Sequence, residues 1–135
     1  FRVGFDPTRD YPLGLARPDL VTTPSGVRLA DLSLDAPDLD ASELRATPDT
    51  LRLQAEVARA AGRSQLADNL LRAAELATVP DETILEIYTA LRPRRSTAGQ
   101  LEDWAAKLES WNAPVTADFV REASHVYRER GLLAV

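Results

Sequence analysis

The sequence predicts an all-α protein, an up-and-down bundle of about four to five helices with an extended N-terminal arm. Two observations lead to this fold class. Five of the nine prolines fall within residues 1–40, where apolar residues show no helical period. From residue 47 onward, apolar residues recur at the i, i+3, i+4, i+7 spacing of amphipathic helices. The chain therefore divides near residue 40, into an arm over 1–40 and a helical domain over 41–135.

The arm carries too many prolines for a long helix and too many apolar residues for plain disorder. Thr23-Pro24-Ser25-Gly26 has the composition of a tight turn between two short extended pieces. We expect residues 9–34 to be extended, and to be ordered by lying on another surface.

Start and stop residues separate the expected helices. After a short turn over 42–46, Thr47 as N-cap and Pro48 at the first position begin a helix that Gly62 ends. The expected helices cover residues 48–61, 64–77, 80–91, 97–110 and 114–130. The inward positions expected on the last three are Ile84, Ile87, Tyr88 and Leu91; Leu101, Trp104, Ala105, Leu108 and Trp111; and Phe119, Ala123, Val126 and Tyr127.

The first two helices are too apolar for ordinary surface helices. In the first, the polar side chains Arg52, Glu56 and Arg59 share one narrow sector, and apolar residues fill roughly 220° of the remainder, against about 100–140° normally. Either these helices lie at the centre of a bundle, or one side meets a partner. Leu53 and Val57 are the candidate contact residues on this face.

Composition excludes several classes of function. A net charge of −5 argues against general nucleic-acid binding, and the absence of cysteine excludes disulfides and thiolate chemistry. No apolar run approaches the roughly 20 residues of a membrane helix. No signal peptide is recognisable at Phe1, although the missing methionine leaves open a lost N-terminal piece. We expect a cytoplasmic protein.

No residue pattern predicts a catalytic, cofactor-binding or metal site. His125 is the only histidine, with no second histidine or cysteine to share a transition metal. The acids Asp35, Asp38, Asp40 and Glu43 lack the glycine and the spacing of a calcium loop. Asp81, Glu82 and Glu86 fall in the first turns of a helix, where the helix dipole alone favours acids.

Arg92, Arg94 and Arg95 follow the end of the third helix and allow three interpretations. Cations are favoured there by the helix dipole. Arginine is also enriched at protein interfaces, where it forms salt bridges with a partner. A phosphate or carboxylate ligand is the third interpretation, but no glycine-rich loop supports it.

Residues 47–97, "TPDTLRLQAEVARAAGRSQLADNLLRAAELATVPDETILEIYTALRPRRST", resemble the small (gamma) subunit of adenosylcobalamin-dependent diol and glycerol dehydratases. Segments carrying the resemblance include Pro48 to Arg52, Gln54-Ala55, Ala61 to Arg63, Arg72 to Leu76, Pro80-Asp81, Ile84 to Tyr88 and Ala90 to Pro93. Asp10-Tyr11-Pro12-Leu13 and residues 113–131 extend it to about residues 9–131. Thr89, Arg94 and residues 35–43 depart from the family pattern, with Arg94 standing where tyrosine is usual.

The resemblance implies a heterohexamer with two copies each of large, medium and small subunits. In such an enzyme the large subunit holds substrate and metal, and adenosylcobalamin lies between large and medium subunits, so this chain binds no cofactor. The implied reaction is radical dehydration of 1,2-propanediol or glycerol to an aldehyde, in the cytoplasm or inside a bacterial microcompartment. This chain would support assembly and stability of the large subunit, with the arm lying chiefly on that subunit.

The residues expected at the partner interface are Tyr11, Pro12, Leu13, Leu53, Val57, Arg92, Arg94 and Arg95. Two alternatives remain. One is a stand-alone helical adaptor that binds other proteins, and the other is a small independent enzyme using Asp81, Glu82 or His125.

Overall fold

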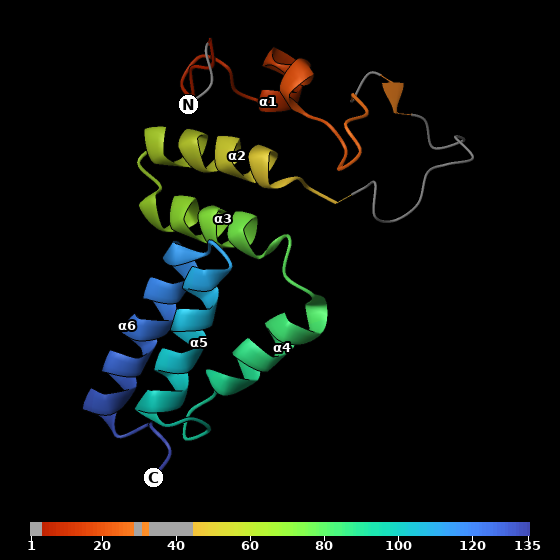
Figure 1. Ribbon diagram of the computed structural model, residues 1–135. Helices are drawn as coiled ribbons and strands as arrows, with labels where there is room; N and C mark the ends of the chain where they lie inside the picture. The colour runs from red at the N-terminus through yellow and green to blue at the C-terminus, as the bar shows by residue number, and fades with distance from the viewer. Residues whose placement is uncertain (1–3, 29–30, 33–44) are drawn as a thin grey trace. The chain divides into compact units, whose positions relative to one another are not determined.

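The computed structural model of the chain describes residues 4–28, 31–32 and 45–135. The chain folds into two compact units, unit 1 over residues 1–74 and unit 2 over residues 75–135. The elements in order are α1 (Leu13–Ala16), η1 (Pro18–Leu20), α2 (Pro48–Ala60), α3 (Ser64–Leu76), α4 (Asp81–Ala90), α5 (Ala98–Ser110) and α6 (Pro114–Arg130) (Figure 1). The all-α prediction is confirmed, because the described residues contain only one isolated β-bridge and no strand. The predicted division near residue 40 lies outside the described ranges.

The five predicted helices are present, with ends within one residue of those expected. The predicted signals explain the ends. The Thr47 hydroxyl accepts a hydrogen bond from the Thr50 N–H at 3.2 Å, and Thr97 and Gln100 form a reciprocal capping box at the start of α5. Gly131 stops α6 in the left-handed conformation, with φ of 67°. Local sequence is therefore sufficient to place these helices.

The N-terminal segment differs from the expected extended arm. Residues 13–16 and 18–20 form short helices, with the Ala16 N–H donating to the Pro12 carbonyl at 2.9 Å. Proline has a fixed φ that suits the first position of a helix, where Pro18 begins η1. Pro12 precedes α1 as its N-cap, in the extended conformation. The turn at residues 23–26 is confirmed, with Gly26 N–H donating to the Thr23 carbonyl at 2.9 Å. The expected turn over 42–46 lies mostly outside the described residues.

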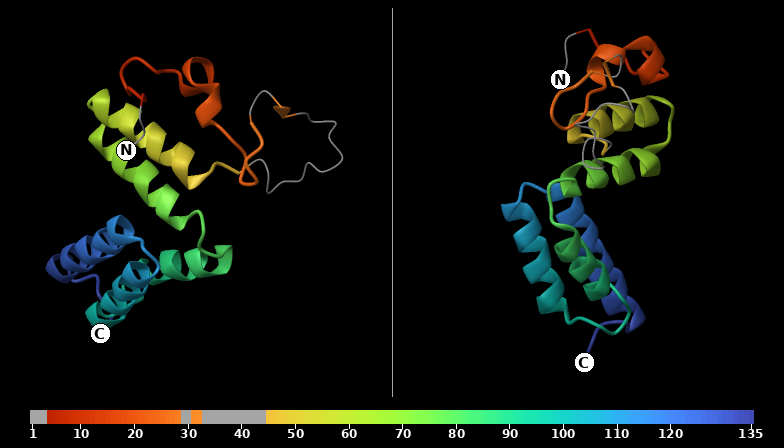
Figure 2. Two further views of the ribbon diagram at one scale, coloured as in Figure 1. Left: turned by 45° about the horizontal axis from the view of Figure 1, so that its top comes forward. Right: turned by 90° about the vertical axis from the view of Figure 1, so that its right-hand side faces the viewer.

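In unit 1, α2 lies between the N-terminal segment and α3 (Figures 1 and 2). Ala55 and Ala58 of α2 are buried against Ala67 of α3, with Leu70 and Leu71 beside them. Small side chains allow two helices to approach closely. This arrangement accounts for part of the wide apolar face of α2, because one side of it is covered by α3.

The core of unit 2 comes from three helices, and its fully buried members lie on α5, on α6 and at Ala113, the N-cap of α6. The buried residues are Ile87, Ala90, Leu101, Ala105, Leu108, Ala113, Ala117 and Val120. The predicted α5 positions are confirmed except for Trp111, which caps the helix and is exposed.

On α6 the prediction of Phe119 as an inward residue is wrong, because Phe119 is exposed and Val120 is fully buried. The buried line runs through Ala113, Ala117, Val120 and the half-buried Tyr127, about 100° around the helix from Phe119. Tyr88 was likewise expected inward on α4 and is exposed. In both cases small buried residues, not the aromatic ring, mark the contact line.

Two sets of polar contacts, one at Glu75 and one at Arg121, connect α6 to other elements of unit 2. Ala113 provides no side-chain cap for α6, and the Glu75 carboxylate serves instead. It accepts from the Val115 N–H at 2.9 Å and from the Thr116 N–H at 2.8 Å. Further along α6, Arg121 bridges Glu102 and Glu109 of α5. These hydrogen bonds raise the pKa of Arg121 and lower the pKa of both glutamates.

Candidate partner interface

Among the described residues, no group of three or more His, Cys, Asp or Glu side chains is placed to hold a metal ion. His125 is exposed on α6, with its Nε2 atom 3.4 Å from the Glu129 carboxylate. Asp81 and Glu82 occupy the first turn of α4 and are exposed. The candidate calcium acids at 35–43 lie outside the described residues. Within the described part of the chain, no helix is long and apolar enough to cross a membrane.

A groove in unit 1 lies between the N-terminal segment and the α2–α3 pair, and we call it the arm groove. Its volume is about 870 Å³. Its lining is mainly apolar: Pro7, Tyr11, Pro12, Leu13, Val57, Ala58, Ala60, Ala61, Leu66 and Leu70, with Thr8, Gly14, Gln54 and Arg63. Tyr11 and Leu66 are exposed, and Leu15 on α1 nearby is 82% exposed. Apolar side chains gathered in this way suit contact with another protein better than contact with water.

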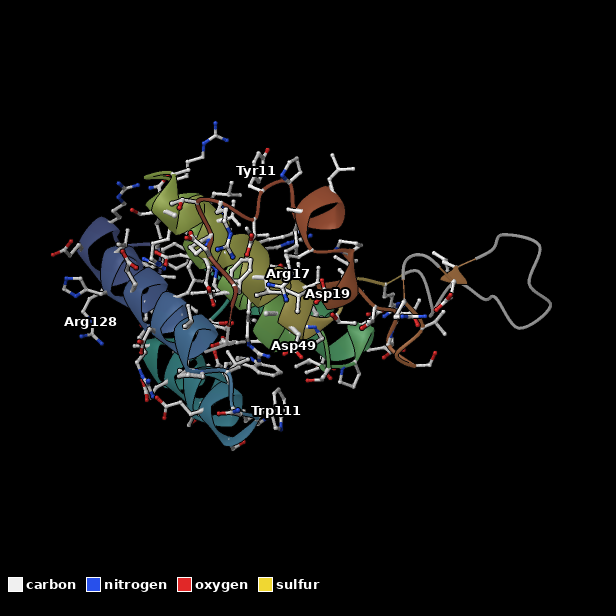
Figure 3. The ribbon with its side chains drawn as sticks, turned by 90° about the horizontal axis from the view of Figure 1, so that it is seen from above. Tyr11, Arg17, Asp19, Asp49, Trp111 and Arg128 are labelled. Carbon is white, nitrogen blue, oxygen red and sulfur yellow. The ribbon has the colours of Figure 1, made fainter. Side chains whose placement is uncertain are left out.

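A network around Asp10, which we call the aspartate clasp, fixes the shape of the N-terminal segment. Arg9 Nε donates to Asp10 at 2.8 Å and the Asp6 N–H donates to Asp10 at 2.9 Å. Arg17 donates to the Gly4 carbonyl at 2.9 Å and pairs with Asp19, toward which it points in Figure 3. The hydrogen bond from Arg9, supported by the Asp6 N–H, lowers the pKa of Asp10 to about 2. The clasp thus holds Tyr11 and Leu13 at the arm groove.

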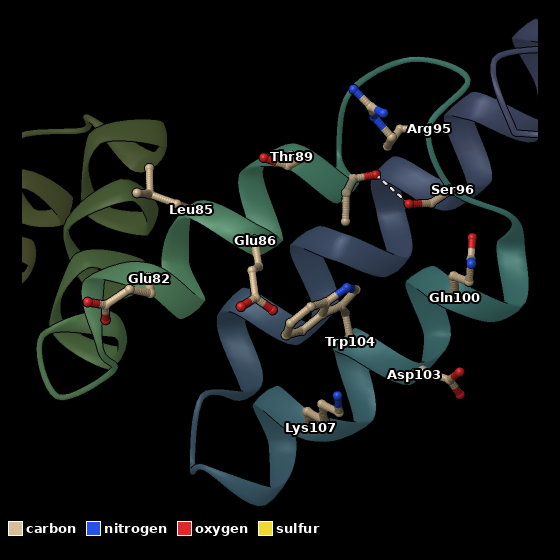
Figure 4. A pocket seen from close by; sticks show the side chains of 11 residues that line it. Glu82, Leu85, Glu86, Thr89, Arg95, Ser96, Gln100, Asp103, Trp104 and Lys107 are labelled. Carbon is tan, nitrogen blue, oxygen red and sulfur yellow. Dashed lines mark hydrogen bonds between the residues drawn. The ribbon is translucent and has the colours of Figure 1, made fainter.

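A second groove lies within unit 2 between α4 and α5, and we call it the α4–α5 groove. Its volume is about 540 Å³, and its lining includes Leu85, Glu86, Arg95, Trp104 and Lys107. Glu86 and Trp104 point toward one another across it (Figure 4). Lys107 Nζ lies 4.7 Å from the centre of the Trp104 ring, a cation–π contact.

The exposed face of α4 beside this groove carries two large apolar side chains. Leu85 is 64% exposed and Tyr88 is 59% exposed, in a unit whose core already contains Ile87 and Ala90 from the same helix. Helix α4 thus buries one narrow line of residues and leaves a second apolar line open. Contact with a partner protein is the simplest way to bury such a line of exposed apolar residues.

The three arginines predicted as contacts lie together on the turn between α4 and α5. Arg92, Arg94 and Arg95 are all exposed. The turn is closed by the buried Ser96 hydroxyl, which donates to the Ala90 carbonyl at 2.8 Å (Figure 4). Arg95 also lines the α4–α5 groove.

The predicted contact residues separate into three groups. Tyr11, Pro12, Leu13 and Val57 come together in the arm groove, and the arginines share one turn. Leu53 stands apart, because it is only 2% exposed in this chain and belongs to its buried core. Its contact with a partner stays a prediction.

The exposed residues Leu15, Leu66 and Leu85 were not among the predicted contacts. Leu85 follows Ile84 directly and precedes Ile87 by two, so it falls outside the i, i+3, i+7 line of Ile84, Ile87 and Leu91. A large apolar residue one position away from the buried line of a helix is the sequence signal that could have identified Leu85.

Over most of its length, this chain is similar to known dehydratase small subunits. Residues 7–134 match the family described as "Dehydratase small subunit". The chain is 50% identical over 125 residues to the propanediol dehydratase small subunit of Citrobacter freundii, covering 90% of this chain and 73% of that protein. It is 49% identical over 125 residues to the propanediol dehydratase small subunit of Salmonella typhimurium, covering 90% of this chain and 72% of that protein.

Proposed function

Because this chain belongs to the dehydratase small-subunit family, we propose that it is the small subunit of a propanediol dehydratase that serves assembly and stability of the complex. The observation that carries the proposal is the 50% identity to a propanediol dehydratase small subunit across 90% of this chain. The proposed partners are a large and a medium subunit, with two copies of each chain. Glycerol is the alternative substrate.

The proposed complex depends on adenosylcobalamin, which supplies radical chemistry when bound. We propose that this chain does not bind that cofactor. Its one histidine, His125, is exposed on α6 beside Glu129 and lines neither groove. We therefore assign no step of the reaction to residues of this chain. We propose that the other subunits bind the cofactor and the substrate.

Two surfaces support a role in assembly. The arm groove with Tyr11 and Leu15, and the α4 face with Leu85 and Tyr88, expose large apolar side chains in clusters. Apolar and aromatic residues dominate the buried centres of protein interfaces. Contacts of obligate complexes often bury more than about 2,000 Å² in total, which one small groove alone does not supply. We propose that both surfaces are covered by partner subunits.

The test separates chemistry from assembly. Asp81→Ala, Glu82→Ala, Arg94→Ala and His125→Ala are each introduced into the reconstituted complex, and turnover is measured per assembled, cobalamin-loaded enzyme. We expect every value to stay within a few-fold of the parent. In contrast, Leu15→Asp and Val57→Asp should reduce the fraction of assembled complex, because an unpaired charge at an interface is costly.

Two outcomes contradict the proposal. One is loss of turnover in a fully assembled, cofactor-loaded complex after a single alanine change at a polar position. The other is a parent chain that remains monodisperse and alone when mixed with large and medium subunits, which favours the stand-alone adaptor.

A further inference from the structure

One end of unit 2 gathers five arginines from two segments far apart in the sequence. Arg92, Arg94 and Arg95 lie on the turn after α4, and Arg128 and Arg130 lie in the last turn of α6. The ends of α4 and α6 lie at the same end of unit 2, where the chain also ends (Figure 1). We call these five residues the basic pole. All five are exposed.

The basic pole differs in its ion pairing from six other arginines of the chain. Arg9, Arg17, Arg28, Arg52, Arg59 and Arg121 each have a carboxylate oxygen within 4 Å. None of the five basic-pole arginines forms an ion pair with a residue that the structure describes. Glu129, the acid between two of them in sequence, contacts His125 instead. In a chain of net charge −5, this end keeps uncompensated positive charge.

Backbone hydrogen bonds hold the two segments of the basic pole together. Arg94 N–H donates to the Leu132 carbonyl at 2.6 Å, and Ala134 N–H donates to the Ser96 carbonyl at 2.8 Å. The Tyr127 hydroxyl adds a third link by donating to the Leu91 carbonyl at 2.5 Å. The arginines therefore project from a fixed framework, which lowers the entropy lost when they bind.

Arg94 is held in a backbone conformation that side chains other than glycine rarely adopt. Its φ is 62°, in the left-handed region, where an ordinary L-residue costs roughly 1 kcal/mol or more. Glycine would relieve that strain. The turn therefore presents the Arg94 side chain at some backbone cost.

The helix dipole explains only part of this arrangement. Cations in the last turn of a helix are favoured, which accounts for Arg128 and Arg130, and for Arg92 just after α4. The effect falls off within one turn, and it gives no reason for Arg94 and Arg95 beyond the helix end. The helix dipole therefore does not explain why as many as five arginines gather at this end of unit 2.

We propose that the basic pole is a docking surface for a carboxylate-rich surface of a partner subunit, a proposal that rests on the function proposed above. Guanidinium groups bind carboxylates through paired, charge-assisted hydrogen bonds, and arginine is enriched at interfaces. The overall negative charge of the chain disfavours a nucleic acid as the partner. The basic pole thus steers and orients the small subunit on an acidic surface, while the apolar surfaces provide most of the buried area.

The test compares two triple variants with the same change in net charge. Arg92→Ala/Arg94→Gly/Arg95→Ala removes three basic-pole arginines, and Arg28→Ala/Arg52→Ala/Arg59→Ala removes three arginines that pair with acids of their own chain. Each full-length small subunit is titrated into the complex of the other subunits at about 50 mM and about 500 mM salt. Thermal unfolding of each free chain controls for folding. Arg94→Gly alone should leave the unfolding temperature within about 2 °C, because relief of strain offsets the added freedom of the unfolded chain.

We expect the basic-pole variant to raise the Kd about tenfold or more at low salt, with a smaller difference at high salt. The control variant should change the Kd by less than about threefold. Equal effects of both variants would overturn the proposal, because net charge alone would then explain binding. An unchanged Kd for the basic-pole variant would overturn it while leaving the proposed function intact, whereas a parent chain that fails to bind at all would overturn the proposed function. Tight binding of the free chain to a heparin column that is lost in the basic-pole variant, with no change in subunit Kd, would assign the basic pole to a polyanion and also overturn the proposal.

Discussion

Asp10 is a buried carboxylate that ties the N-terminal segment of unit 1 together. Two hydrogen bonds from Arg9 and one from the Asp6 N–H satisfy its oxygens, and Arg17 Nη1 lies 3.7 Å away. These contacts lower its pKa from the ordinary value of 3.8 to about 2. Asp6 and Asp19 next to it also have lowered pKa values, because Thr8 and Arg17 respectively donate hydrogen bonds to them.

The first prediction concerns pH. A carboxylate with a depressed folded-state pKa stabilises the folded state above its unfolded pKa, and that stabilisation is lost as the pH falls from about 4 toward 2. We expect the protection factors of the amides in residues 4–20, which correct for the intrinsic pH dependence of exchange, to fall over this range. Asp10→Asn should show fast exchange already at neutral pH and a weaker acid dependence. Asp118→Asn, at an exposed position of α6, serves as the control, and an unchanged acid dependence in Asp10→Asn would contradict the prediction.

The second prediction concerns Glu75, which caps α6 from a distant part of the sequence. Glu75→Ala leaves the Val115 and Thr116 N–H groups without their acceptor and removes a negative charge from a helix N-terminus. We expect a loss of about 1–2 kcal/mol in the free energy of unfolding, measured with urea. Glu75→Gln keeps one acceptor oxygen and should lose less. Glu122→Ala, an exposed change on α6, should stay within about 0.5 kcal/mol, and a Glu75→Ala value equally small would show that the cap is not needed.

At the scale of elements, α2 and α4 differ in how far the rest of the chain covers their apolar residues. The apolar sector of α2 is wide because one side packs on α3 and another side, with Val57, lines the arm groove, so the width of the sector does not by itself identify a partner surface. Helix α4 has a narrower apolar pattern, yet it leaves Leu85 and Tyr88 exposed. The exposed line on α4 is therefore a second candidate for a contact between subunits, beside the arm groove.

The third prediction tests this line. Leu85→Glu with Tyr88→Glu should change the free energy of unfolding of the isolated chain by less than about 1 kcal/mol, because both side chains are already exposed. The same pair should reduce the yield of assembled complex several-fold, since two charges would enter an apolar contact. Ala106→Glu on the exposed face of α5 is the control. A pair variant that assembles as well as the parent would remove α4 from the interface.

At the scale of the whole molecule, the chain places its charge and its apolar surface unevenly. The net charge is −5, yet five arginines without ion pairs to described residues share one end of unit 2. Large apolar side chains gather along the arm groove and α4. Such a surface is typical of a subunit rather than of a protein that works alone.

The fourth prediction concerns the requirement for the chain as a whole. Large and medium subunits produced without it should yield less assembled enzyme, and adding the purified chain should raise that yield. Turnover per assembled enzyme should be similar whether the chain was present from the start or added later. The measurement is size-exclusion chromatography with activity per cobalamin-loaded complex. An assembly that forms and persists equally well without the chain would argue against an assembly role.

The sequence by itself determined the helices and the family. Caps such as Thr47, Thr97 and Gly131 act within a few residues, so their effect can be read from neighbouring letters. The same local signals fixed helix ends to within one residue. The family followed from the motif-rich block at residues 47–97, which the comparisons support over residues 7–134.

Only the tertiary structure decided which side chains are covered. Leu53 and Leu15 are both leucines within helices, yet Leu53 is buried and Leu15 is exposed, because burial depends on what the fold places opposite each residue. Periodicity identifies a helix face only to within about one position, which is why Phe119 was exchanged for Val120. The basic pole likewise could not be read from the sequence, since Arg94 and Arg130 are 36 positions apart and the fold brings their segments to one end of unit 2, where the Arg94 N–H donates to the Leu132 carbonyl.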